Sequence, residues 1–177
     1  MFRDNSLIPS EAIRLAALGF LADGPRRYGD LAAAIRHFTS CVAGPSLELM
    51  GSSLELLRYE GLASSGGSAA AENGTLEITE AGRQTLHALL KARLRAPLGD
   101  FNRLTLLLKL RFLHVLPAGE RHEQMALIAE SVESELARLK ELRRADAAAP
   151  GAFVEWLDHD IATLQARLQS LRVPAAE

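Results

Sequence analysis

Apolar residues recur every three or four positions through most of the chain, which is the spacing of amphipathic helices. Ile13, Ala16 and Phe20 follow this spacing shortly after Ser10. Because serine is a favoured N-cap residue, we expect a first helix that Ser10 caps and that Gly24-Pro25 ends.

Two further helices follow, the second at about residues 28–37 and the third at about residues 47–60. A turn at residues 43–46 separates them, and its last residue, Ser46, can cap the third helix. The outward face of the third helix is the candidate recognition surface. Its inward face should consist of three apolar side chains, Met50, Leu54 and Leu57.

A glycine-rich segment, Ala63–Thr75, contains Gly66-Gly67 and Asn73-Gly74, which are turn signals typical of a β-hairpin. Thr79 then caps a fourth helix, which Pro97 ends. Helix, turn, helix, helix and hairpin in this order form the winged helix-turn-helix, a DNA-reading module. We therefore predict a mainly α fold: a winged helix-turn-helix domain with a small β-hairpin wing, followed by a C-terminal helical dimerisation region.

Three more helices are predicted after the fourth, at about residues 100–115, 119–144 and 152–172. The last two carry apolar stripes at helical spacing, and together these offer more apolar surface than one helical hairpin can bury. We expect a homodimer held by these helices, with residues 1–96 as the winged helix-turn-helix DNA-binding domain and residues 97–177 as the helical dimerisation region. The stripe of the last helix consists of Phe153, Leu157, Ile161, Leu164, Leu168 and Leu171.

The composition suits a folded protein, since 48% of the 177 residues are hydrophobic and 24% are charged. The formal net charge of −2 gives no general support for DNA binding. Residues 1–96 contain ten Lys or Arg and ten Asp or Glu. Because phosphate contacts depend on cations, any DNA footprint must be a local patch.

Other function classes are excluded by what the sequence lacks. A single cysteine, Cys41, cannot form an intramolecular disulfide and suits a reducing compartment. The N-terminus has no apolar stretch of signal-peptide length, so we predict a cytoplasmic protein without a membrane partner. The five histidines have no metal-ligand spacing, and no nucleophile–base pair or phosphate loop is present. We predict no metal, no cofactor and no enzymatic activity.

Short sequence strings spread over most of the chain resemble those of the PadR family of bacterial winged-helix regulators. They are Leu18–Pro25, Glu60-Gly61-Leu62, Leu76–Arg83, Leu113–Pro117 and Glu155-Trp156-Leu157. The resemblance implies a homodimer whose two recognition helices enter successive major grooves of a palindromic double-stranded DNA operator. It also implies repression of transcription, with release in some members by a small aromatic or cationic effector.

Several residues are candidates for DNA contacts. Arg26 and Arg27 lie at the predicted start of the second helix, where backbone N–H groups also attract phosphate. Arg58 lies on the outer side of the recognition helix. The full set of predicted DNA-binding residues is Arg26, Arg27, Tyr28, Ser46, Ser52 and Arg58.

Two questions stay open at the level of sequence. Trp156, the single tryptophan, is either a flat wall of a ligand pocket between the subunits or an anchor of the dimer core. DNA binding also has an alternative, because Gly29 and Gly51 stand where the family usually has tyrosines and Ala63–Thr75 contains no Lys or Arg. The alternative function is a winged-helix dimer with lost or weak DNA affinity that acts as a protein interaction module.

Overall fold

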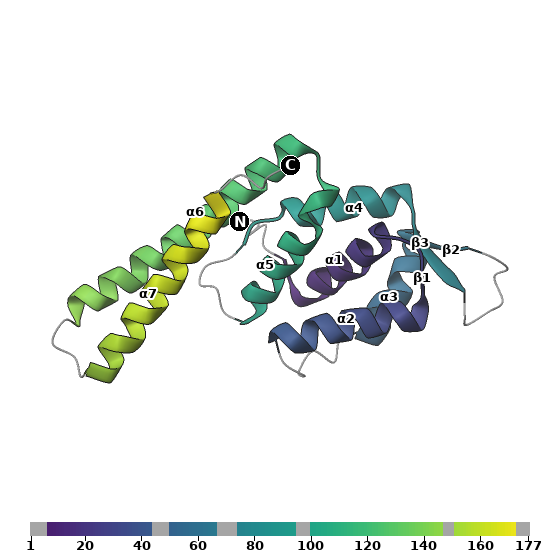
Figure 1. Ribbon diagram of the computed structural model, residues 1–177. Helices are drawn as coiled ribbons and strands as arrows, with labels where there is room; N and C mark the ends of the chain where they lie inside the picture. The colour runs from purple at the N-terminus through teal and green to yellow at the C-terminus, as the bar shows by residue number, and fades with distance from the viewer. Residues whose placement is uncertain (1–6, 44–49, 67–73, 95–99, 147–150, 173–177) are drawn as a thin grey trace, which may run out of the picture.

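Five helices and a small sheet form the first part of the molecule, and a helical hairpin extends from it (Figure 1). The computed structural model describes residues 7–43, 50–66, 74–94, 100–146 and 151–172. The helices are α1 (Pro9–Ala22), α2 (Tyr28–Ala43), α3 (Met50–Tyr59), α4 (Glu80–Lys91), α5 (Asp100–Phe112), the short 3₁₀ helix η1 (Leu113–Val115), α6 (Ala118–Ala145) and α7 (Gly151–Arg172). The strands are β1 (Arg26–Arg27), β2 (Ala63–Gly66) and β3 (Thr75–Ile78).

The predicted fold class is confirmed: the molecule is mainly helical and carries a winged helix-turn-helix followed by C-terminal helices. The sheet has three antiparallel strands in the order β1-β3-β2, so the predicted hairpin gains a third strand. Arg26 pairs with Leu76, and Ser65 on the other side of β3 pairs with the same leucine. A strand of two arginines has no alternating pattern, which is why the sequence did not indicate it.

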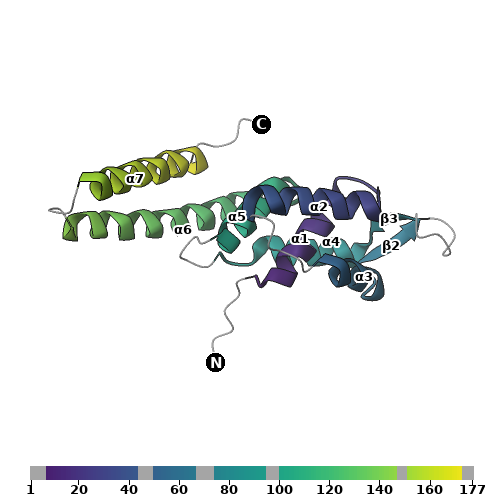
Figure 2. The ribbon, with the colours of Figure 1, turned by 90° about the horizontal axis from the view of Figure 1, so that it is seen from below.

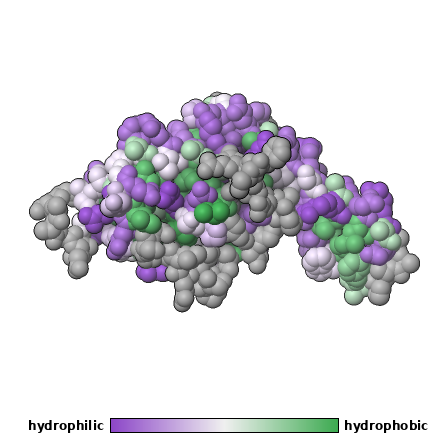
Figure 3. Space-filling model, turned by 180° about the vertical axis from the view of Figure 1, so that it is seen from behind, coloured by the Kyte–Doolittle hydropathy of each residue, from purple (hydrophilic) through white to green (hydrophobic). Residues whose placement is uncertain are grey.

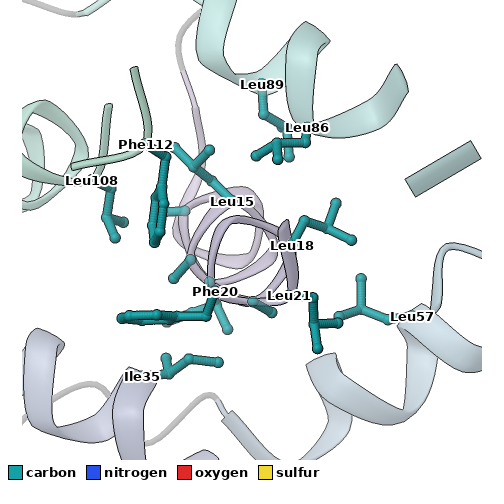
Figure 4. Close-up of a cluster of buried hydrophobic side chains, with 14 of the residues drawn as sticks. Leu15, Leu18, Phe20, Leu21, Ile35, Leu57, Leu86, Leu89, Leu108 and Phe112 are labelled. Carbon is teal, nitrogen blue, oxygen red and sulfur yellow. The ribbon is translucent and has the colours of Figure 1, made fainter. Parts of the chain in front are cut away.

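Helix α1 lies at the centre of the core, with helices α2 to α5 around it (Figure 4). Leu15 and Leu18 are fully buried on α1, and Phe112 of α5 packs edge-to-face on Phe20 with 5.2 Å between ring centroids. A Cβ added at Gly19 would lie 2.4 Å from the Phe112 ring. The absence of a side chain at Gly19 therefore lets α5 approach α1 closely.

The core thus continues past residue 97 and includes α5, whose Leu104, Leu108 and Phe112 are fully buried in it. The predicted division into residues 1–96 and 97–177 concerns function, namely DNA binding and dimerisation. As a functional boundary it stays a prediction.

The helix boundaries differ from the predicted ones at three places. Helix α2 continues to Ala43, beyond the predicted end at about residue 37, because Thr39 is buried and Val42 packs against the core. Ile8, not Ser10, is the N-cap of α1, since Pro9 begins the helix and the Glu11 carboxylate accepts the Ile8 N–H at 2.9 Å. Helix α4 ends at Lys91, short of Pro97, because Ala92 has extended backbone angles.

Thr79 caps α4 as predicted and joins it to the end of α3. Its Oγ1 accepts the Gly82 N–H at 3.0 Å, and its hydroxyl donates to the Gly61 carbonyl at 2.7 Å. Gly82 lies so close to the preceding turn that an added Cβ would be 2.1 Å from the Leu62 carbonyl oxygen. This contact fixes α4 against the turn that leads from α3 to the wing.

The hairpin of α6 and α7, called the arm below, extends away from the core (Figures 1 and 2). Its two apolar stripes face each other, with Val132, Leu136 and Leu164 as the buried cluster. Arg143 pairs with Asp158 at 2.9 Å across the two helices. Three large apolar side chains remain on the surface of the arm: Leu142 at 40% exposure, Phe153 at 39% and Trp156 at 63%.

Figure 3 shows a green apolar area near the far end of the arm, surrounded by hydrophilic residues. None of the described helices is long and apolar enough to cross a membrane.

Candidate nucleic-acid interface

Helix α3 has one side in the core and one side in solvent. Leu54 and Leu57, two of the three residues predicted to face inward, are each 1% exposed, and the side chain of Met50 lies outside the described residues. The opposite side, with Glu55, Leu56, Arg58 and Tyr59, is exposed. Figure 2 shows α3 at the edge of the molecule beside β2. An outward helix beside a wing is the arrangement that places a recognition helix in a major groove.

Arg26 and Arg27 are adjacent in β1 but have different surroundings. The Arg26 Nε donates to the Phe20 carbonyl at 3.2 Å, and its guanidinium lies 5.4 Å from the centroid of the Phe20 ring. Arg27 is exposed and pairs through the backbone with Thr75. Arg27 is therefore the freer of the two for a phosphate, while Arg26 joins the end of α1 to the sheet.

The remaining predicted DNA-binding residues are Tyr28, Ser46 and Ser52. Tyr28 begins α2, is partly buried and packs against the core. Ser46 lies outside the described residues, as does the side chain of Ser52, whose backbone belongs to the first turn of α3. The assignment of these residues to DNA binding stays a prediction.

Exposed arginines lie on several of the surrounding elements: Arg27 on β1, Arg36 on α2, Arg58 on α3 and Arg83 on α4. The nearby Glu60 is paired with Arg14 at 2.8 Å, which offsets one of the negative charges at the end of α3. Strands β2 and β3 contain no Lys or Arg. Positive charge therefore comes from the helices and β1, and the described strands of the wing hairpin contribute none.

An ionic cluster holds the loop before β1. Asp23, at the end of α1, accepts from the Arg111 guanidinium at 2.7 Å and lies 3.2 Å from His114 Nε2. These two residues belong to α5 and η1, at the root of the arm. The cluster thus connects the root of the arm to the segment that carries Arg27.

Lys109 is a charged side chain that is buried, at 2% exposure, at the junction of core and arm. Its ammonium group donates to the Leu90 carbonyl at 2.5 Å and to Gln124 Oε1 at 3.3 Å. Burial in the apolar junction lowers the pKa of Lys109 to about 8. The residue therefore links α5 to the end of α4 and to α6.

A cavity of about 260 Å³ lies beside Lys109, between residues 92–94 and α6. Polar side chains of α6 line it, including Gln124, Glu130, Ser131 and Ser134. No cluster of three or more His, Cys, Asp or Glu side chains suited to a metal ion occurs among the described residues.

The chain belongs to a family of transcription regulators: residues 2–174 match the family model described as "Putative AphA-like transcriptional regulator". This match confirms the prediction of a PadR-like transcription regulator, and the family is not one of enzymes. A comparison with curated proteins gives no match.

Three solved structures that are similar to this chain have low sequence identity to it. Bacillus subtilis PadR is 16% identical, with 94% of this chain and 98% of that chain covered and a TM-score of 0.42. The same protein in complex with operator DNA is 18% identical, with coverage of 89% and 98% and a TM-score of 0.40. The protein smu.1604c of Streptococcus mutans UA159 is 17% identical, with coverage of 93% and 98% and a TM-score of 0.39.

Proposed function

We propose that the protein is a cytoplasmic, homodimeric repressor that binds a palindromic DNA operator through the outward face of α3. The observation that carries this proposal is the exposed side of α3, a helix that packs beside β2 of the sheet. Exposed arginines also occur on β1, α2 and α4. Since one winged helix reads only a half-site, two copies about one helical turn apart would read an inverted repeat.

The arm supports dimerisation. Among the described residues, its buried cluster consists of Val132, Leu136 and Leu164 with four partly buried apolar residues packed against them, while Phe153 and Trp156 stay exposed on α7. A second copy would remove this apolar surface from water. Light scattering at micromolar protein concentration should give the mass of a dimer, and a monomeric mass would contradict the proposal.

Arg27 and Arg58 are proposed as phosphate contacts, because both are exposed, one on β1 and the other on α3. We expect the double variant Arg27→Ala, Arg58→Ala to lose about 1 to 3 kcal/mol of binding free energy for all DNA sequences alike. The dependence of log K on log salt should also become shallower by about 1 for each lost phosphate contact. Fluorescence anisotropy across a salt series measures both effects.

The matched control is Arg121→Ala with Arg144→Ala, which removes two exposed arginines from α6 and leaves the interface unchanged. This control should bind DNA like the unmodified protein. Equal affinity and equal salt dependence for the interface variant and its control would remove Arg27 and Arg58 from the footprint.

The alternative, a protein interaction module, is favoured by one observation, the absence of Lys and Arg from Ala63–Thr75. The two functions differ in the binding partner, which is DNA for the repressor and a protein for the interaction module. Selection of genomic fragments by the purified protein at about 0.1 M salt should enrich one inverted repeat if the protein is the repressor, because that ionic strength screens non-specific contacts. Absence of any enriched sequence, with a specific protein recovered instead, would support the interaction module.

Control by a small aromatic or cationic effector is also part of the proposal. Trp156 is 63% exposed on α7 and offers a flat ring to a planar cation. As the single tryptophan, it reports binding directly. Titration with a planar aromatic cation should quench its fluorescence and weaken operator binding. Unchanged fluorescence would leave Trp156 as a dimer-core anchor alone.

A further inference from the structure

The exposed face of α3 contains apolar surface that the fold does not use. Leu56 is 45% exposed and Tyr59 is 90% exposed. They lie three residues apart and therefore on the same side of the helix. Leu54 and Leu57 fill the inward side, so Leu56 and Tyr59 are not needed to attach α3 to the core.

The surroundings of this pair indicate the occupant. Arg58 lies between the two residues in sequence and is exposed, and Arg27 is exposed on β1. A helix face that combines two exposed apolar side chains with a neighbouring exposed arginine suits a polyanion that has apolar groups inside a groove. In the major groove of DNA, the C5-methyl group of thymine is the apolar group at a base edge.

The size of the apolar surface agrees with this occupant better than with a protein partner. Protein interaction sites are contiguous apolar patches of at least several hundred Å². Leu56 and Tyr59 are two side chains beside the charged residues Glu55 and Arg58. The apolar surface of these two side chains is enough to contact two thymine methyl groups.

We propose that Leu56 and Tyr59 are specificity-determining residues that contact thymine methyl groups in each operator half-site. The inference rests on the proposed DNA binding through α3. Three residues of helix rise about 4.5 Å, close to the roughly 3.4 Å between stacked base pairs. The two side chains therefore contact neighbouring A·T pairs, and the half-site contains thymines at adjacent positions.

The test uses the duplex that the purified protein enriches most strongly from a random library, and replaces each thymine in turn by deoxyuridine. This replacement removes one methyl group and leaves the Watson–Crick pairing unchanged. At the positions under α3 we expect affinity to fall about fourfold for each methyl group removed, the effect of one buried methylene-sized group.

The variant Leu56→Ala should lose this discrimination at one position, so that thymine and deoxyuridine duplexes bind it equally. Tyr59→Phe retains the ring and should retain the discrimination, whereas Tyr59→Ala should lose it at the neighbouring position. The control is Ile8→Ala, which shortens another exposed aliphatic side chain, 57% exposed, at the start of α1 and should keep the thymine-to-uracil ratio. Because the readout is a ratio within one variant, a general loss of stability does not imitate the effect.

The possible failures are distinguishable. Binding of an enriched duplex with equal affinity for thymine and deoxyuridine at every position overturns this inference and leaves the proposed function intact. So does an enriched half-site without adjacent thymines. If no duplex is enriched at all, the proposed DNA binding fails, and the inference fails with it.

Discussion

The core and the arm differ in how much of their apolar surface they bury within one chain. In the core, side chains from α1 to α5 and from the sheet form one cluster around α1. In the arm, two long helices meet along a single seam, and Leu142, Phe153 and Trp156 remain exposed. The core has the properties of an independently stable unit, whereas the arm leaves apolar surface that the proposed dimer would cover.

The largest expected effect is on the core. Phe112→Ala removes a fully buried ring that contacts Phe20 and rests against Gly19, so the free energy of unfolding should fall by about 3 to 5 kcal/mol. Urea denaturation followed by circular dichroism measures this loss. Tyr59→Ala, which truncates an aromatic residue with 90% exposure, is the matched control and should change stability by about 0.5 kcal/mol or less. Similar losses for both variants would contradict the described packing of α5.

The second effect concerns the arm alone. The sequence placed Leu164 in a dimer seam, and in the structure it is 5% exposed against Val132 and Leu136 of its own chain. Leu164→Asp puts an unpaired carboxylate into that seam, at a cost of about 3 kcal/mol or more. We expect α6 and α7 to lose hydrogen-exchange protection while α1 to α4 keep theirs, and the proposed dimer to dissociate.

Gln165→Asp, at an exposed neighbouring position, is the control and should keep both the protection and the mass of the protein. If Leu164→Asp unfolds the core together with the arm, the two regions form one cooperative unit. The contrast between core and arm would then be wrong.

The smallest effect tests the junction between the two regions. The pKa of Lys109 is about 8 in the folded protein and about 10.5 in the unfolded chain. Between these values the unfolded chain binds more protons, so stability rises with pH as the buried ammonium loses its charge. From pH 7.5 to pH 9.5 this contribution should increase by about 1 to 2 kcal/mol.

Lys109→Met removes the titrating group and keeps a side chain of similar length. The difference in unfolding free energy between this variant and the unmodified protein should therefore shift by that amount over the same pH range. Other groups that titrate there are present in both proteins and cancel in the difference. A difference that stays constant with pH would mean that Lys109 does not change its charge on burial in this range.

The elements with a clear period could be predicted from the sequence, and those that depend on distant contacts could not. The stripe from Phe153 to Leu171 indicated α7 to within one residue of its start, because helical amphipathicity is a local property. The two arginines of β1 form a strand only because β3 lies beside them. The contacts of Arg26 with Phe20 could not be read from the spacing of the two residues.

Lys109 shows the same limit at the junction. Its neighbours along the chain, Leu108 and Leu110, are apolar, whereas its hydrogen-bond acceptors come from α4 and α6, 19 and 15 residues away. Trp156 is 63% exposed in its own chain, and both of its predicted roles, ligand wall and dimer anchor, concern contacts with a second chain, which no pattern within one sequence indicates.

The length of α6 has a mechanical consequence. Its 28 residues span about 42 Å, while its first turns are held at the core through Gln124 and Lys109. Because α6 is held near its first turns, a small tilt there moves its far end by a much larger distance. A tilt of about 10° at the root would displace the far end by about 7 Å over that length. In the proposed symmetric dimer joined at the arms, a rearrangement of a few side chains at the root would therefore change the distance between the two α3 helices. That distance must match about one pitch of the DNA.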